Sequence, residues 1–159
     1  MDLTLLTTDD VARLVRDLTP AQKARVVHVH HAAYDTYIGR RCGTLAASKW
    51  CNLFRLDRES ERRHVLRQYT DHLLTNTPLL ADLQELEGKT LGCWCRKPGH
   101  DVLCHGLVLV ALCDEQQDRE HIEMPTACMR CLIEPANGDD LCSTCRTGTV
   151  ITPRLASKA

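Results

Sequence analysis

The chain has 159 residues, of which 43% are hydrophobic, 4% aromatic and 26% charged, and its formal net charge is −1 at pH 7. This length suits one ordinary domain with a small unit attached, and the charge excludes a basic field over the whole molecule that would attract nucleic acid. The sequence contains no run of eighteen apolar residues, so we expect no membrane contact.

Ten cysteines point to metal or thiol chemistry. The first ten residues, MDLTLLTTDD, carry acids where a secretory signal needs basic residues, so we expect no export. In a reducing compartment, clustered cysteines are more often metal ligands or catalytic thiols than disulfides. We therefore expect a cytoplasmic protein.

The first part of the chain predicts two short helices and a strand. Residues 8–18 have an amphipathic pattern behind a cap at Thr8, and Pro20 suits the first turn of a second helix. Residues 25–31, RVVHVHH, are rich in β-branched residues and predict a strand. We treat residues 1–25 as an N-terminal helical segment.

The middle of the chain is irregular at first and then helical. Residues 32–54 show no clear periodicity and predict a long loop, a kind of segment that is often functional. Residues 58–75 predict an amphipathic helix, and a second helix begins at Pro78 and ends at Gly88.

The second half of the chain completes an α/β pattern. Residues 90–95 predict a second strand, residues 104–113 a buried helix, and residues 114–125 a linker or a solvated helix end. Strand, loop, helices, strand and helix together indicate an α/β fold with a small, mostly parallel sheet and flanking helices. We assign residues 26–118 to this domain and residues 119–159 to a zinc ribbon with a basic tail.

Two CxxC pairs near the end of the sequence predict a closed metal site. The turn-forming stretch EPANGDD lies between the pairs. Four thiolates complete a tetrahedral Zn²⁺ site, and a unit this small needs a bound metal to stabilise its fold. Iron of the rubredoxin type uses the same ligands. A ribbon of this kind is a contact surface for nucleic acid or for a protein partner. The four predicted ligands are Cys128, Cys131, Cys142 and Cys145.

A second group of cysteines lies between the last strand and the last helix. On a continuing strand Cys93 and Cys95 share one face and Trp94 points the other way, and Cys104 and His105 stand at the following helix start. Three sulfurs and an imidazole form an ordinary zinc set. Two other interpretations stay open: a nucleophilic thiol at Cys104 beside His105, or cysteines that only pack in the core.

The long loop carries residues suited to a nucleotide. A glycine allows close backbone approach, an arginine binds a phosphate with two N–H groups, and an aromatic ring stacks on a base. The helix start at residue 104 adds unpaired backbone N–H groups. His28, His30 and His31 on the first strand could reach the same edge. The candidate ligand-binding residues are Tyr37, Gly39, Arg40, Lys49, Trp50 and Asn52.

The motifs YIGR, SKWCNLF, GKTLGCWC and CHG, in this order, resemble a family of small bacterial and phage domains of unknown function, over about residues 26–113. The chain departs from that family's pattern at Cys51 and Leu53, where Gly and Pro are usual, and at Leu107, where an acid is usual. If that acid is a catalytic base or a magnesium ligand, we expect this chain to have a weakened activity or a different function. The resemblance implies one functional constellation of Tyr37, Gly39, Arg40, Lys49, Asn52, Cys93, Cys95, Cys104, His105 and Gly106.

These observations lead to one main hypothesis, an α/β domain that binds a nucleotide or a nucleic-acid base, with a Zn²⁺ ribbon that recruits it to nucleic acid. If it is an enzyme that cleaves a glycosidic bond or modifies a base, Cys104 and His105 lie at its reacting centre. The alternative is a non-catalytic zinc-binding interaction or regulatory module that docks on nucleic acid or on a host protein. A redox sensor with exposed free cysteines is a third interpretation.

Overall fold

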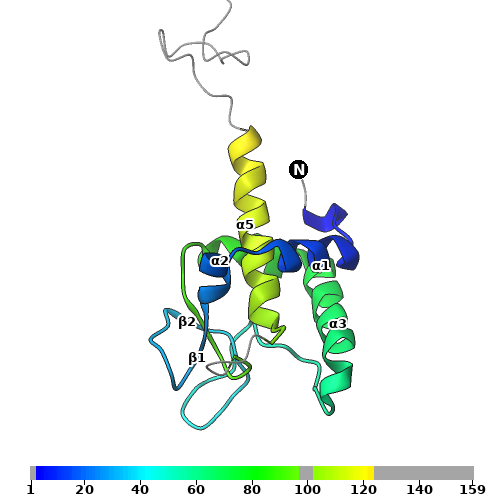
Figure 1. Ribbon diagram of the computed structural model, residues 1–159. Helices are drawn as coiled ribbons and strands as arrows, with labels where there is room; N and C mark the ends of the chain where they lie inside the picture. The colour runs from blue at the N-terminus through cyan, green and yellow to red at the C-terminus, as the bar shows by residue number, and fades with distance from the viewer. Residues whose placement is uncertain (1–2, 97–101, 124–159) are drawn as a thin grey trace, which may run out of the picture. The chain divides into compact units, whose positions relative to one another are not determined.

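The computed structural model describes residues 3–96 and 102–123 (Figure 1). The chain divides into two compact units, Met1–Arg119 and Glu120–Ala159, and only the first is described over most of its length. The elements, with η marking a 3-10 helix, are η1 (Leu3–Leu5), α1 (Thr8–Asp17), α2 (Pro20–Ala24), β1 (Val26–His28), β2 (Thr36–Tyr37), η2 (Glu59–Glu61), α3 (Arg62–Thr75), α4 (Thr77–Ala81), η3 (Asp82–Leu86), β3 (Leu91–Cys93) and α5 (His105–Glu123).

A three-stranded parallel sheet organises the first unit. The strand order is β1-β3-β2, so the last of the described strands lies in the centre. Val26 of β1 and Thr36 of β2 both pair with Leu91 of β3. The predicted small parallel sheet with flanking helices is therefore confirmed for this unit. The ligands of the predicted C-terminal ribbon lie outside the described residues.

The strands are shorter than predicted, and one was missed. The strand expected over 25–31 ends at His28 because the chain turns there: the His31 N–H donates to the His28 oxygen. The strand expected over 90–95 ends at Cys93. β2 lies inside the segment 32–54 that was predicted to be a loop, since two residues carry no periodicity.

The helices follow the predicted pattern with small corrections. Thr7, not Thr8, caps α1, because its hydroxyl accepts from the Asp10 N–H and the Asp10 carboxylate accepts from Thr7 in return. The helix expected from Pro78 to Gly88 is two short helices, α4 and η3. The polar stretch after the last buried helix continues as α5 as far as Glu123.

Helix α5 passes through the core of the first unit. Its residues 107–113 are all buried, which agrees with the apolar sequence LVLVALC. Figure 1 shows α5 between α2 and the strands on one side and α1 and α3 on the other. Further along α5, Asp114 accepts hydrogen bonds from Arg25 at 2.6 Å and from Gln22 at 2.8 Å. Among the described helices, none is both long and apolar enough to cross a membrane.

Gly106 brings the start of α5 against the sheet. A Cβ atom at this position would lie 2.6 Å from Val26 Cγ1 and 2.9 Å from Ile38 Cδ1. Both neighbours are buried, so neither can swing away freely. The glycine therefore sets how closely α5 approaches β1 and the residue that follows β2.

We expect Gly106→Ala to destabilise the fold by about 1–3 kcal/mol, because the added methyl group overpacks this contact. Urea unfolding followed by circular dichroism measures the change in the free energy of unfolding. An unchanged or higher stability would contradict this role of Gly106, because it would show that α5 and the sheet can move apart to accommodate the methyl group without loss of stability.

Candidate metal centre and adjoining cleft

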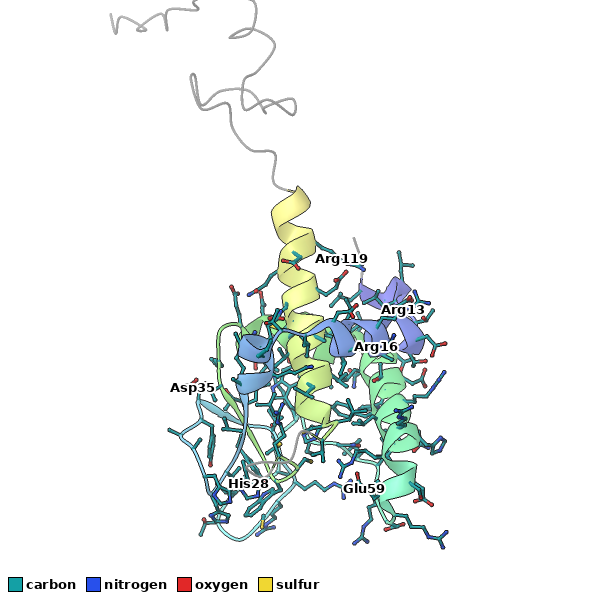
Figure 2. All side chains as sticks on the ribbon, in the orientation of Figure 1. Arg13, Arg16, His28, Asp35, Glu59 and Arg119 are labelled. Atoms are coloured by element: carbon teal, nitrogen blue, oxygen red, sulfur yellow. The ribbon has the colours of Figure 1, made fainter. Side chains whose placement is uncertain are left out.

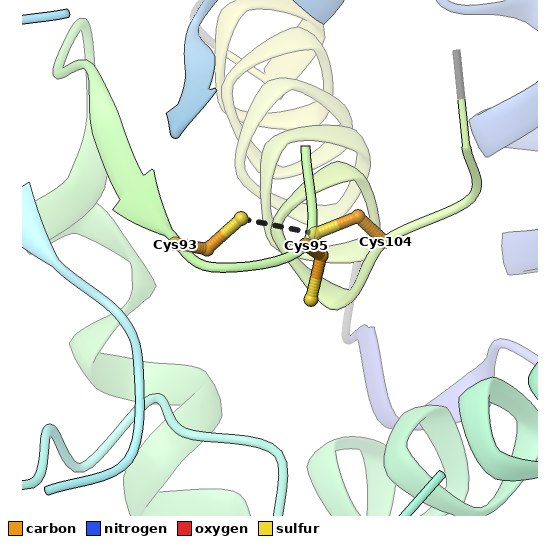
Figure 3. Close-up of side chains that lie close together, drawn as sticks. All are labelled: Cys93, Cys95 and Cys104. Carbon is orange, nitrogen blue, oxygen red and sulfur yellow. Dashed lines mark hydrogen bonds between the residues drawn. The ribbon is translucent and has the colours of Figure 1, made fainter. Parts of the chain in front are cut away.

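Three cysteines meet at the carboxyl end of the central strand (Figure 3). Cys93 is the last residue of β3, Cys95 follows two residues later, and Cys104 directly precedes α5. Their Sγ atoms all lie within 4.8 Å of one another, and the Cys93 and Cys104 sulfurs are 3.3 Å apart. Three cysteines in this arrangement could hold a metal ion.

His105 brings an imidazole nitrogen close to two of these cysteines. Its Nδ1 atom lies 3.8 Å from the Sγ atoms of both Cys95 and Cys104. Its Nε2 atom lies 2.9 Å from the backbone oxygen of Ile38. Because a carbonyl oxygen only accepts, Nε2 carries the proton and Nδ1 keeps a lone pair on the side of the sulfurs. Burial lowers the pKa of His105, which keeps the ring neutral and able to ligate.

Hydrogen bonds among the three cysteines shift the pKa values of their thiols in opposite directions. Hydrogen bonds from Cys104, and then from Cys95, lower the pKa of Cys93. The bond to Cys93, the bond to Cys95 and burial raise the pKa of Cys104 well above its usual value. One thiolate is thus favourable in this cluster, whereas three at once need a cation among them.

A cleft of about 280 Å³ adjoins the cluster. Five residues singled out in the sequence line it together, although they come from separate segments. Two residues that sequence reasoning did not place in the site, Arg62 at the start of α3 and Trp94 after β3, also line it. The predicted residues in the lining are Gly39, Arg40, Asn52, Cys95 and His105.

Arg40 holds one wall of this cleft in place. Its Nε donates to the Asn52 oxygen and its Nη2 to the Phe54 oxygen, both at 2.6 Å. These two N–H groups were expected to bind a phosphate, and they bind the protein's own backbone. Gly39 leaves room for the Tyr37 ring, because a Cβ atom on Gly39 would collide with the Tyr37 hydroxyl oxygen.

Tyr37 does not line the cleft itself but connects two residues that do, Arg40 and Trp94. Its hydroxyl donates to the Arg40 oxygen at 2.5 Å and accepts from the Trp94 Nε1–H at 2.9 Å. Trp94 is 36% exposed, so part of its ring remains open. It lines the same cleft as Cys95, because the strand ends at Cys93 and the alternation that was expected to separate them stops there.

Two further expected ligand-binding residues, besides Tyr37, lie outside the cleft lining. Trp50 is only 2% exposed and its backbone oxygen accepts from the buried Tyr69 hydroxyl at 2.7 Å, so its ring packs in the core and cannot stack on a ligand. Lys49 forms ion pairs with Asp82 at 2.7 Å and Glu85 at 2.8 Å and does not line the cleft. The stacking position expected for Trp50 is offered by Trp94 instead.

Cys104 also occupies a different position from the one expected of a nucleophile. It is 1% exposed and does not line the cleft, whereas the half-buried Cys95 does. Cys95 is therefore the sulfur of the cluster that a molecule in the cleft would meet.

The histidines of the first strand pack around Trp94. The ring of His28 lies 5.6 Å from the Trp94 ring and 4.8 Å from the His31 ring, and the His30 ring lies 4.8 Å from Trp94. His30 and His31 belong to the turn after β1, and not to the first strand where they were expected. In the described part of the chain, the close group of metal-type donors is the three cysteines.

Arg62 is a functional candidate that the sequence offered little reason to choose. Its Nη1 donates to the Leu103 oxygen at 2.9 Å, one residue before Cys104, and its other nitrogens bind Glu59. In the sequence it is one of many charges at the start of a helix. Only the tertiary contact with Leu103 distinguishes it.

The fold and this cluster define a small parallel α/β domain with a cysteine site at the carboxyl edge of its sheet. Residues 21–115 match the family described as a domain of unknown function, DUF4326, and the chain belongs to that family. This confirms the expected membership of a family without an established activity.

The chain is also similar to a viral protein, Uncharacterized protein R718 of Acanthamoeba polyphaga mimivirus. The two sequences are 36% identical over 86 residues, which is 49% of this chain and 65% of that relative. The chain thus spans less than two thirds of the relative's length. No solved structure matches the chain.

We expect Arg40→Met to loosen the wall of the cleft, because it removes two hydrogen bonds to backbone oxygens and keeps the aliphatic stem. The backbone amides of residues 52–56 should exchange with solvent deuterium at least about tenfold faster, because the loss of even one of the two charge-assisted hydrogen bonds costs about 1.5–3 kcal/mol. Hydrogen-exchange mass spectrometry measures this.

Arg41→Met is the matched control, since Arg41 is the exposed neighbour and lies outside the cleft lining. Equal effects of the two variants would contradict the assigned role of Arg40.

Proposed function

We propose that this domain binds a nucleotide or a nucleic-acid base in the cleft, beside a zinc ion held by the three cysteines and His105. The observation that carries the proposal is that one cleft is lined both by cationic and aromatic side chains, Arg40, Arg62 and Trp94, and by two of the four metal-type donors, Cys95 and His105. Binding residues and metal donors therefore belong to a single site.

The donor set supports zinc. Three thiolates and one neutral imidazole are a common tetrahedral zinc set, with Zn–S distances of about 2.3 Å and Zn–N distances of about 2.0–2.1 Å. Ligating histidines usually donate their other ring N–H to a carbonyl or a carboxylate, as His105 does to Ile38. A bound ion would tie the end of β3 to the start of α5 and so hold the wall of the cleft formed by Cys95 and His105.

The rest of the lining supports an anionic, aromatic ligand. Arg40 and Arg62 both line the cleft, and no carboxylate is among the described residues of the lining. Arg62 is already paired with Glu59, whereas Arg40 binds neutral backbone oxygens and keeps its positive charge for a ligand. The Trp94 ring offers a surface for stacking, and Asn52 offers an amide with both a donor and an acceptor. The volume lies near the lower end of small-molecule sites, which span roughly 300–1,000 Å³. A single nucleotide or an unstacked base suits a site of this size.

If the domain is catalytic, we propose that it is a cytoplasmic enzyme that modifies a base or a nucleotide. The predicted ribbon of Cys128, Cys131, Cys142 and Cys145 would then recruit the domain to nucleic acid or to a protein partner. Within the described domain, the sulfur that meets the ligand is Cys95, in place of the buried Cys104 expected from the sequence.

A second candidate is a non-catalytic zinc module that docks on nucleic acid or a host protein. Two observations favour it. Cys93, Cys104 and His105 are buried, as in closed four-ligand sites that only stabilise a fold. Leu107 is 2% exposed on the core side of α5, so this position supplies no acid to a reaction.

We expect two zinc ions per full-length chain, one in the described cluster and one in the predicted ribbon. Cys104→Ser should lower the content to one, because it removes a central ligand, and the double variant Cys128→Ser/Cys131→Ser should also lower it to one. Elemental mass spectrometry of purified protein measures the metal content.

Cys51→Ser is the control, since Cys51 is a half-buried free cysteine outside the cluster. It should retain both ions. A Cys104→Ser chain with the same zinc content as the wild type would contradict the assigned metal site.

We expect the full-length chain to bind nucleoside monophosphates, and Trp94→Ala to weaken this binding about tenfold or more, because base–aromatic stacking is worth about 1–3 kcal/mol. Isothermal titration calorimetry with AMP, GMP, CMP and UMP measures the affinity. Lys49→Ala should leave the affinity unchanged, since Lys49 lies outside the cleft.

If none of the four nucleotides binds, or if Trp94→Ala binds as well as the wild type, the nucleotide assignment fails. Chromatography of the nucleotides after incubation with the protein separates the two candidates, because any turnover excludes the non-catalytic module.

A further inference from the structure

A second hollow, which the proposed nucleotide site does not use, lies between α1 and α3. Its volume is about 490 Å³, larger than that of the cleft. Its apolar surface comes from Val11 and Val15 of α1, Leu66 of α3, Leu103 before α5 and Val108 within it. We call this hollow the α1–α3 groove. Leu66 also lines the nucleotide cleft, so the two sites are neighbours along α3.

The apolar part of the groove is open to solvent at one point. Leu103 is 39% exposed, although a leucine of this size usually packs inside a fold. Ala12, the small residue between Val11 and Val15, is exposed and also lines the groove. A side chain from outside therefore has both an apolar surface to cover and a space above Ala12 to enter.

The charged residues in the groove lining are all arginines. Arg16 comes from α1, and Arg63 and Arg67 come from α3, so the cations stand on both walls. The described lining contains no carboxylate. Arg67 is held by Asp9 at 3.1 Å and by the Thr8 hydroxyl at 3.4 Å. Within residues 3–96 and 102–119, Arg16 and Arg63 form no ion pair; Arg16 is labelled on α1 in Figure 2.

We propose that the α1–α3 groove binds an acidic, amphipathic peptide segment of a protein partner. An aliphatic side chain of the partner covers Leu103 and enters above Ala12, and its Asp or Glu side chains pair with Arg16 and Arg63. Arginine is well suited to such contacts because its guanidinium binds a carboxylate with two parallel N–H groups.

The arrangement favours a peptide over other anions. Arg16 and Arg63 stand on two different helices, so a ligand with several carboxylates along its length can pair with both, whereas a fatty acid carries a single one. The lining holds no aromatic ring among the described residues, so it offers no stacking surface for the bases of a single-stranded nucleic acid. An amphipathic helix laid in a groove places apolar anchors and flanking acids at the required spacing.

The test uses the full-length chain and a fluorescein-labelled helical peptide of about 18 residues, with leucines along one face and glutamates elsewhere. Fluorescence anisotropy should show binding that weakens as the salt concentration rises. The same peptide with lysines in place of the glutamates should not bind. Arg16→Glu, Arg63→Glu and Ala12→Trp should each weaken binding about tenfold or more, the last by filling the groove.

Arg13→Glu is the matched control. Arg13 lies one turn before Arg16 on the same helix, pairs with Asp10 and does not line the groove (Figure 2). It makes the same change in net charge, so it should leave the affinity within about twofold of the wild type. Circular dichroism of each variant shows whether it is folded, and Ala12→Trp, on an exposed position, tests the groove without changing any charge.

The proposal is overturned if the glutamate peptide does not bind, or if Arg13→Glu weakens binding as much as Arg16→Glu does. It is equally overturned if oleate or a single-stranded oligonucleotide binds the wild type but not Ala12→Trp, while the peptide binds neither. None of these results depends on zinc or nucleotide binding, so the two proposals succeed or fail separately.

Discussion

The hydrogen bond from His105 Nε2 to the backbone oxygen of Ile38 connects the parts of this molecule on which its site depends. It joins the residue after β2 to the first residue of α5, and both residues are buried. It also fixes which ring nitrogen carries the proton, and so directs the Nδ1 lone pair toward the cysteines. Gly106, the next residue, allows the helix to come close enough for this bond to form.

The parallel sheet explains why residues that are distant in sequence meet at one place. All three strands run in the same direction, so the segments that follow them leave from the same edge. The turn after β1 supplies His30, which packs on Trp94, the segment after β2 supplies Arg40, and the segment after β3 supplies Cys95. Helix α5 then returns through the core and places His105 at this edge. The metal donors and the cleft are thus consequences of one topology.

Sequence reasoning reached the parallel sheet, the buried α5 and the meeting of Cys93, Cys95 and Cys104, because each has a local signal in hydrophobic pattern or spacing. It missed β2, whose two residues are a strand only because β3 pairs with them. It also misplaced the aromatic group. Trp50 lies in a motif rich in polar residues but is fixed in the core by Tyr69, a contact across nineteen positions of sequence. Such contacts leave no periodicity that a single sequence can reveal.

The central position of β3 also determines the order in which the protein can form. β1 and β2 do not pair with each other, so neither has a partner until the chain has been made as far as residue 93. Pairings between segments so far apart in sequence close large loops and form slowly. During synthesis, the backbone groups of the first two strands therefore remain hydrogen-bonded to water until β3 has been made. Cys93 is the last residue of β3. The pairing of β3 that completes the sheet therefore also brings the first metal-type donor to the edge of the sheet.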